Sequence, residues 1–329
     1  MSSFESRGRS RTMLAAKGGR GVGIVVLAFV ASFISPSLAK AQQAVQGFAL
    51  ERLYPSAPGA GWFVMDDLNI EGGLGGAVTL TTDYARQPLK VTSPDGAQHL
   101  SVVSIEALVD VGLAATYRRY RVYLNFPMPL AVTGTSGMLG PYQFTAPDVN
   151  IGTNPDSISD TRVGFDVRLL GEPAGLLRLG AGAQLIIPFG TRADYVTDGT
   201  FRGFIRGLVA GDVGRFSYAG QLGVHVRPLD DSPAPGSPAG SELVFGLSAG
   251  RRMSAGSGWM IAIGPEFYGE TASFHSLFGE TTGLEGLLTA RFDAPGNGPH
   301  IRIKLGAGAG SVRAGAGGAA RGGASGLPA

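Results

Sequence analysis

Two runs of alternating apolar and polar residues, joined by a break rich in glycine and proline, occupy Thr161–Pro188. A period of two residues indicates an extended strand, because successive side chains point to opposite faces of a sheet. The break at Gly171–Gly175 predicts that the two strands form an antiparallel hairpin. One face of this hairpin is apolar, while the other carries arginine, aspartate, glutamine and glycine.

The predicted strands are long. Strands of soluble sandwiches usually have about 5–6 residues, whereas these runs have roughly nine or more, the length with which a tilted strand crosses a bilayer. The same pattern recurs through most of the chain. The further runs are Gly75–Arg86, Val102–Tyr117, Tyr120–Leu130, Arg202–Val213, Phe216–Arg227, Glu242–Arg252, Trp259–Gly269, Leu284–Phe292 and His300–Leu305.

The links between these runs alternate in length. Bacterial outer-membrane barrels place short turns in the periplasm and long loops outside the cell, and a soluble barrel has no reason to sort its links in this way. The short links are Arg118-Arg119, Gly171–Gly175, Gly214-Arg215, Ser254–Gly258 and Asp293–Pro299, and the long ones are Gln87–His99, Ala131–Asp160, Phe189–Phe201, Pro228–Gly240 and Glu270–Thr281.

The sequence therefore predicts an all-β fold, a transmembrane antiparallel up-and-down β-barrel of about twelve strands. Closure with both ends in the periplasm needs an even number of strands, and eleven runs are clear. We expect the barrel in 73–310 and a Gly/Ala-rich low-complexity tail in 311–329. The twelfth strand either forms weakly from Gly308–Gly315 or is missing. Residues 42–72 alternate poorly and are predicted to be a periplasmic lead-in or a partial plug.

The N-terminal region has the pattern of a secretory signal. Five basic residues precede the apolar run Val22–Ile34, and Ala39-Lys40-Ala41 fits the small-x-small cleavage rule. We expect a cleaved signal peptide in 1–41; the alternative is an uncleaved anchor. Only 16% of residues are charged, against about 25% in ordinary soluble proteins. The net charge of +2 gives no reason to expect nucleic-acid binding, and the lack of cysteine excludes disulfides and thiolate metal sites.

The polar faces of the runs predict a lumen lined by charged residues. Basic residues exceed acidic ones there by eleven to eight. Twelve strands lie between filled eight-stranded barrels and open porins, so we expect a narrow or partly plugged pore, with a weak anion preference if a path remains. The lumen-lining candidates are Glu106, Asp110, Arg121, Arg162, Asp166, Arg168, Arg178, Gln184, Arg206, Gln221, His225, Glu242, Glu266, Glu285 and Arg291.

Catalytic and cofactor-binding patterns are nearly absent. None of the four histidines has a metal-ligand spacing, and His225 is interpreted as a satisfied lumenal residue. His275 with Ser273 or Ser276 offers the one local pairing for a lipid-acting enzyme. Acidic loop residues such as Asp194 and Asp198 are interpreted as solvated rather than as calcium ligands. We expect no catalytic residues, no cofactor and no metal.

Seven segments of the chain together carry a resemblance to a known family. They are Gln46–Leu50, Trp62–Asp66, Asp166–Glu172, Ile187–Gly199, Ala210–Arg227, Gly240–Gly246 and Gly264–Thr271. In this order they resemble the N-terminal β-barrel region of OmpA-type outer-membrane proteins from myxobacteria-like bacteria. The chain departs from that family where a peptidoglycan-binding domain often follows the barrel, because it ends in the Gly/Ala tail. The resemblance implies an outer-membrane barrel and supplies no catalytic residues.

The sequence thus predicts an integral protein of the cell outer membrane with a structural or narrow porin-like role and no catalysis. Its expected partners are outer-membrane lipid, the barrel assembly machinery and small solutes, without nucleic acid; the oligomeric state stays open. Two alternatives also stay open, a lipid-acting barrel enzyme and a secreted soluble β-rich adhesin.

Overall fold

A computed structural model describes residues 43–50, 53–93, 96–155, 158–229, 240–272, 282–295, 301–312 and 321–323. All of them belong to the unit Gln42–Ala329. The expected signal peptide in 1–41 lies outside the described residues, and so does most of the expected tail. In the described part of the chain, no helix has the length and apolarity needed to cross a bilayer.

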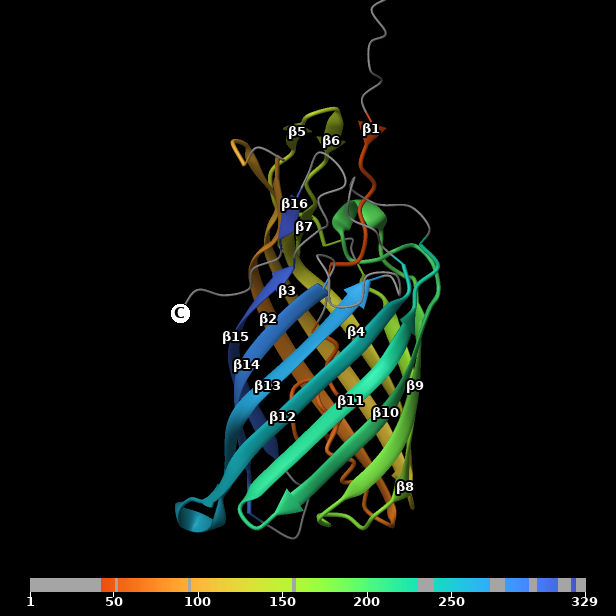
Figure 1. Ribbon diagram of the computed structural model, residues 1–329, viewed down its shortest axis with the longest axis vertical. Coiled ribbons are helices and arrows are strands. Elements are labelled where there is room, and N and C mark those ends of the chain that lie inside the picture. The colour runs from red at the N-terminus through yellow and green to blue at the C-terminus, as the bar shows by residue number, and fades with distance from the viewer. Residues whose placement is uncertain are drawn as a thin grey trace, which may run out of the picture. The chain divides into compact units, whose positions relative to one another are not determined.

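A 13-stranded sheet dominates the structure (Figure 1). Two of its strands are short, and the other eleven follow one another across the sheet in sequence order as antiparallel neighbours. We call these eleven strands the wall. They are β2 (Leu74–Thr92), β3 (His99–Tyr117), β4 (Tyr120–Thr133), β8 (Thr161–Leu170), β9 (Arg178–Ile187), β10 (Arg202–Val213), β11 (Phe216–Val226), β12 (Glu242–Ser254), β13 (Met260–Ala272), β14 (Thr282–Asp293) and β15 (Arg302–Val312).

Each run predicted from the sequence forms one strand of the wall, so the predicted all-β, up-and-down fold is confirmed. Of the two alternatives for the twelfth strand, a separate strand that starts at Gly308 is wrong. Residues up to Val312 continue β15 and pair with β14, where Val312 lies opposite Gly283. The reason is that β14 offers backbone partners along this whole stretch, and no turn residue interrupts the glycines and alanines of β15.

The wall curls around an interior, the lumen, but the hydrogen bonds among the described residues do not close it into a ring. The last short strand, β16 (Arg321–Gly323), pairs antiparallel with β2 at Lys90–Thr92. Among the described residues, no ladder joins the rest of β2 to β15. We call the gap between these two edge strands the seam. The expected even-stranded closure is therefore not made by backbone pairing.

The two faces of the wall differ sharply in chemistry. Outward positions are apolar and exposed: Leu80 is 72% exposed, Leu222 59%, Leu247 67% and Phe267 62%. Inward positions are polar and buried, and the alternation of exposed and buried residues in β8 to β12 follows the two-residue period of the sequence. The period of two thus separates an apolar exterior from a charged interior.

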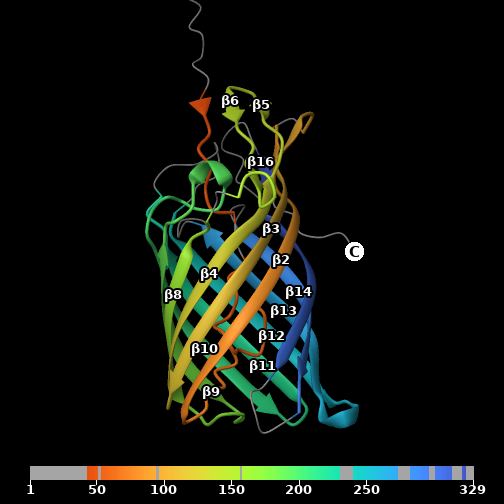
Figure 2. The same cartoon turned by 180° about the vertical axis from the view of Figure 1, so that it is seen from behind.

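Long links gather at one end of the wall and short turns at the other (Figure 2). The long-loop end also carries a small three-stranded sheet and the cluster of Leu89, Val102, Val132, Phe144 and Tyr195. The predicted alternation of links between the two ends is confirmed for the described strands, but the expected long link Gln87–His99 is wrong. Residues up to Thr92 continue β2, because they pair with the start of β3, and the link left between them, 93–98, is shorter than the link 171–177 between β8 and β9. The remaining elements are β1 (Gln43–Ala44), β5 (Gly137–Leu139), β6 (Tyr142–Phe144), β7 (Asp148–Asn150), η1 (Arg192–Asp194) and, at the short-turn end, η2 (Gly256–Gly258).

One glycine of the wall makes room for an aromatic ring. Gly164 on β8 lies opposite Tyr123 on β4, and a Cβ at Gly164 would overlap the Tyr123 ring. We expect Gly164→Ala to lower the free energy of unfolding by about 1–3 kcal/mol, because the ring must shift in a filled interior. Urea unfolding of the refolded protein measures this difference.

Gly207→Ala is the matched control, because the nearest atom to a Cβ at Gly207 would be the carbonyl oxygen of Leu222, 3.8 Å away. Equal midpoints for the two variants would contradict the inward placement of Tyr123.

Candidate functional site

The lumen is filled by the chain that precedes the wall. Residues 53–72, the lumenal segment, run inside the wall toward the start of β2 at the short-turn end (Figure 2). Trp62, Met65 and Leu68 of this segment are 1%, 0% and 0% exposed. They pack against Leu208 of β10 and Tyr268 of β13 in one hydrophobic cluster. An apolar segment with no alternation therefore finds its partners inside the barrel rather than in a sheet.

A single carboxylate holds three consecutive amides of the lumenal segment. Glu266 of β13 accepts hydrogen bonds from the backbone N–H of Phe63 at 2.8 Å, Val64 at 2.9 Å and Met65 at 3.2 Å. The hydroxyl of Thr289 on β14 donates to the same carboxylate at 2.7 Å. Glu266 is fully buried. Because the segment's irregular backbone has no strand partner here, this carboxylate satisfies donors that would otherwise be unpaired.

Buried ion pairs join the middle of the lumenal segment to the wall. Arg121 of β4 binds both Asp66 of the segment and Asp166 of β8, the latter at 2.8 Å. Arg206 of β10 lies 3.3 Å from Asp166 and donates to the Tyr123 hydroxyl at 3.0 Å. Such charges are stable in a low-dielectric interior only when they are paired and hydrogen-bonded. Asp66 thus completes a network that the wall alone leaves incomplete.

Nearer the short-turn end, basic side chains of the wall donate to backbone carbonyls of the segment. Arg178 donates to the carbonyl of Asp67 at 2.8 Å, and Arg168 donates to that of Ile70 at 2.8 Å. Lys304 of β15 donates to the carbonyl of Trp62 at 2.8 Å. Irregular backbone leaves carbonyl groups unpaired, and these cations satisfy them.

At the long-loop end, a second network anchors residues 43–50, which we call the anchor. Asp198, in the loop between β9 and β10, accepts the backbone N–H of Ala49 at 2.9 Å and is bound by Arg227. Arg227 also lies 3.0 Å from Glu242. The backbone N–H of Leu50 donates to the carbonyl of Tyr195 at 3.1 Å. The chain therefore contacts the long-loop end first and the short-turn end last.

Two loop residues that contact the anchor, Asp198 and Tyr195, have shifted pKa values. Burial alone would raise the pKa of Asp198, but the hydrogen bond and charge of Arg227, with the charge of Arg202 and the Ala49 amide, lower it below its usual range. Burial raises the pKa of Tyr195 to about 12. The interpretation of Asp198 as a solvated acid is wrong, because it is 1% exposed and paired.

Three side chains near this end could hold a metal ion. His225, Glu242 and Glu270 each offer one ligand atom, and these atoms lie within 4.8 Å of one another. The His225 Nδ1 is 3.2 Å from Glu242, whose other oxygen is bound by Arg227. They come from three neighbouring strands, so no local spacing in the sequence could have revealed them. Arg227 competes with a cation for Glu242, and we assign no metal.

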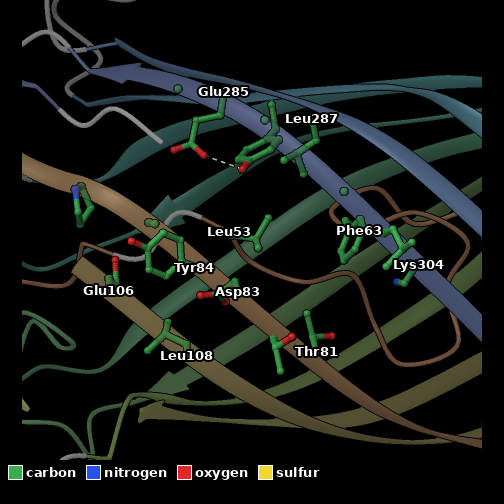
Figure 3. A pocket seen from close by; sticks show the side chains of 18 of the residues that line it. Leu53, Phe63, Thr81, Asp83, Tyr84, Glu106, Leu108, Glu285, Leu287 and Lys304 are labelled. Carbon is green, nitrogen blue, oxygen red and sulfur yellow. Dashed lines mark hydrogen bonds between the residues drawn. The ribbon is translucent and has the colours of Figure 1, made fainter. Parts of the chain in front are cut away.

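A cavity of about 710 Å³ remains between the lumenal segment and the seam (Figure 3). Leu53 and Phe63 of the segment line it, together with side chains of β2, β3, β13, β14 and β15. Glu285 points into this region and accepts a hydrogen bond from the Tyr268 hydroxyl at 2.6 Å. The rest of the lumen is largely occupied by side chains and by the segment.

The lumen-lining candidates prove to be buried polar residues, with the exception of the half-buried Glu285. The structure brings Arg121, Asp166 and Arg206 together, joins Gln184 to Tyr123 and Gln221 to Arg206, and pairs Arg162 with Asp110. The buried candidates are Glu106, Asp110, Arg121, Arg162, Asp166, Arg168, Arg178, Gln184, Arg206, Gln221, His225, Glu242, Glu266 and Arg291.

Sequence reasoning missed the acids that enter the lumen from outside the strands. Asp66 and Asp67 of the lumenal segment and Asp198 and Asp160 of the long loops all pair with wall arginines or lie beside them. The excess of basic residues on the inward face was the available signal. Asp66 and Asp67 offset two of its three charges and leave an excess of one, so the expected anion preference, which stays a prediction, has a smaller basis. The Ser273, His275 and Ser276 pairing lies outside the described residues.

Comparison with protein-family models finds no family that matches the chain. A search of curated proteins finds no match either.

We expect low pH to weaken the attachment of the anchor, because it protonates the Asp198 carboxylate that accepts the Ala49 amide. A carboxylate whose pKa is lowered on folding stabilises the fold above its unfolded pKa, and that stabilisation is lost as pH falls through the folded pKa. We expect the protection of the Ala49 amide, measured against its intrinsic exchange rate at the same pH, to fall below about pH 4. We also expect Asp198→Asn to exchange faster already at neutral pH, since about 1–3 kcal/mol is lost when a buried charge partner is removed. Hydrogen-exchange mass spectrometry of the anchor peptide measures both.

Asp148→Asn is the control, because Asp148 is exposed at the start of β7. Unchanged exchange at Ala49 in Asp198→Asn would show that the carboxylate does not hold the anchor.

Proposed function

We propose that this protein is an integral outer-membrane β-barrel whose lumen is closed at rest by its own N-terminal segment. Its role is structural, or that of a narrow channel that conducts only when the lumenal segment moves. The supporting observation is the division of the wall into an apolar outward face and an ion-paired inward face. This division is the reverse of that in a water-soluble protein and matches the chemistry of lipid-exposed barrels.

The size of the outward apolar surface supports a lipid environment. Large apolar side chains are exposed on every strand of the wall, among them Leu80, Val122, Phe165, Leu247 and Leu288. Soluble monomers rarely expose contiguous apolar patches beyond a few hundred Å². In a bilayer the same apolar surface contacts hydrocarbon rather than water, so its exposure carries no hydrophobic cost. A secreted soluble adhesin would have to cover this face with another protein.

The sorting of links gives the orientation in this proposal. Short turns face the periplasm and long loops the exterior in bacterial barrels. The anchor then lies on the outer side, and the lumenal segment passes inward to β2. Of the two predictions for 42–72, the contacts of Glu266 and Asp66 favour the partial plug. Outer-membrane lipid and the barrel assembly machinery are the partners that this location implies.

Arginine at the centre of the outward face tests the membrane location. Leu247 lies near the middle of β12 and is 67% exposed. We expect Leu247→Arg to destabilise the protein in lipid by about 2–4 kcal/mol, because the charge enters hydrocarbon. Folding into vesicles, followed by the heat-dependent gel shift, gives the measurement.

The control is Leu176→Arg, since Leu176 is also 67% exposed but lies in the short link between β8 and β9. We expect Leu176→Arg to be near neutral. If Leu247→Arg were equally well tolerated and the protein fractionated as soluble, the outer-membrane proposal would fall and the adhesin alternative would replace it.

Removal of the Glu266 carboxylate tests whether the segment closes the lumen. The wild-type protein should be almost silent in a planar bilayer. Glu266→Ala leaves the amides of Phe63, Val64 and Met65 without their acceptor, at about 1–3 kcal/mol for each buried donor. We expect open-channel events to rise by about tenfold or more, since 1.4 kcal/mol corresponds to a factor of ten.

Glu71→Ala is the matched control, because Glu71 belongs to the same segment but is exposed. An equal rise in both variants, or no rise in either, would show that Glu266 does not control closure. The structural role would then stand without the channel.

A further inference from the structure

The cavity at the seam has the size of a small-molecule site. Its volume of about 710 Å³ falls within the roughly 300–1,000 Å³ of typical ligand pockets. It extends along β2 from Val78 to Pro88 and along β15 from Arg302 to Gly310. Leu53, Phe63 and Leu287 form an apolar middle (Figure 3). The walls of this cavity are thus two strand edges rather than closed sheet.

Both edges offer backbone groups to a ligand. Among the described residues, β2 has a partner on its seam side only at Lys90–Thr92, and β15 has none on its seam side. Such edges are templates for an added strand. At membrane depth each unpaired N–H or C=O costs several kcal/mol, which favours an occupant that can pair with them.

The two ends of the cavity carry opposite charge. Asp83, Glu106 and Glu285 lie toward the long-loop end, whereas Lys304 lies beside Phe63 toward the short-turn end (Figure 3). Glu285 is opposite Gly310, six residues beyond Lys304 along β15. At about 3.4 Å per residue the two charges are therefore about 20 Å apart.

The ammonium group of Lys304 can bind an anionic group of a ligand. Its ammonium donates to the Trp62 carbonyl at 2.8 Å and lies 5.3 Å from the centre of the Phe63 ring. Within the described residues, no carboxylate forms an ion pair with it, and two of its three donors remain available. A ligand carboxylate would supply the missing negative charge.

We propose that the seam binds an extended oligopeptide of about six residues by strand addition, with its carboxylate at Lys304 and its amino group at Asp83, Glu106 and Glu285. The polarity follows from the fold. Both β2 and β15 run from the short-turn end to the long-loop end, so an antiparallel strand between them has its amino end at the acidic group. Oligopeptides would then be the solutes of the proposed outer-membrane protein, and this inference rests on that proposal.

A hydrocarbon chain fits less well as an occupant. It could cover Leu53 and Leu287 but would leave the backbone edges unpaired.

Equilibrium binding to the protein in lipid nanodiscs tests the inference. The probe is a tritiated hexapeptide of alternating alanine and valine with free termini, with empty nanodiscs as the blank. We expect saturable binding of one peptide per chain. Amidation of the peptide's C-terminus should weaken binding by about tenfold, and Lys304→Met should weaken binding of the free peptide to the same degree. The amidated peptide should bind wild type and Lys304→Met equally.

Lys90→Met is the matched control, because Lys90 lies on β2 outside the cavity; it should bind both peptides as wild type does. Absence of saturable binding would overturn the inference. So would equal weakening of both peptides by Lys304→Met, or displacement of the peptide by palmitate at equal concentration. The gel shift and membrane fractionation of the same preparation test the outer-membrane proposal separately, so the two failures are distinguishable.

Discussion

The structure depends on the pairing of charges that a period of two residues places on the inner side of a barrel. Alternation puts Arg121, Arg206 and Glu266 in an enclosed space, where an unpaired charge is costly. The wall supplies some partners, such as Asp166 for Arg206. It does not supply enough of them, and the lumenal segment provides Asp66 together with a row of backbone amides and carbonyls. The segment is thus part of the electrostatic balance of the barrel.

This dependence links stability to closure. Glu266 holds three amides of the lumenal segment and Arg121 binds Asp66 in the same segment, while Asp198 holds the anchor that precedes it. Moving the segment would leave these buried groups unpaired. Buried ion pairs add little net stability, but removing one partner is strongly destabilising. In the proposed channel these contacts would close the lumen at rest, and a solute would pass beside the segment, where the seam cavity lies.

The seam shows where backbone pairing ends. The wall follows sequence order from β2 to β15 without a crossover, and every internal strand has two partners. At one edge, the second half of β15 consists largely of glycine and alanine, and the described sheet ends with this strand. A lipid-facing edge cannot remain unpaired at low cost. A site for an added strand is the simplest chemistry that such an edge offers.

The sequence by itself determined the strands, their order and their faces. The alternation in runs such as Val102–Tyr117 requires a strand with one apolar side, because side-chain direction depends only on the local backbone. Long and short links followed from turn residues in the same local way. Tertiary structure alone decided that Trp62–Ile70 lies inside the wall, which residues pair with Asp198, and that β15 and β2 do not pair with each other. The contacts involved join residues far apart in the chain: Asp66 and Arg121 are separated by 55 positions, Ala49 and Asp198 by 149, and Val64 and Glu266 by 202. Such contacts depend on which charges remain unsatisfied once the wall has curled, and no local pattern records that.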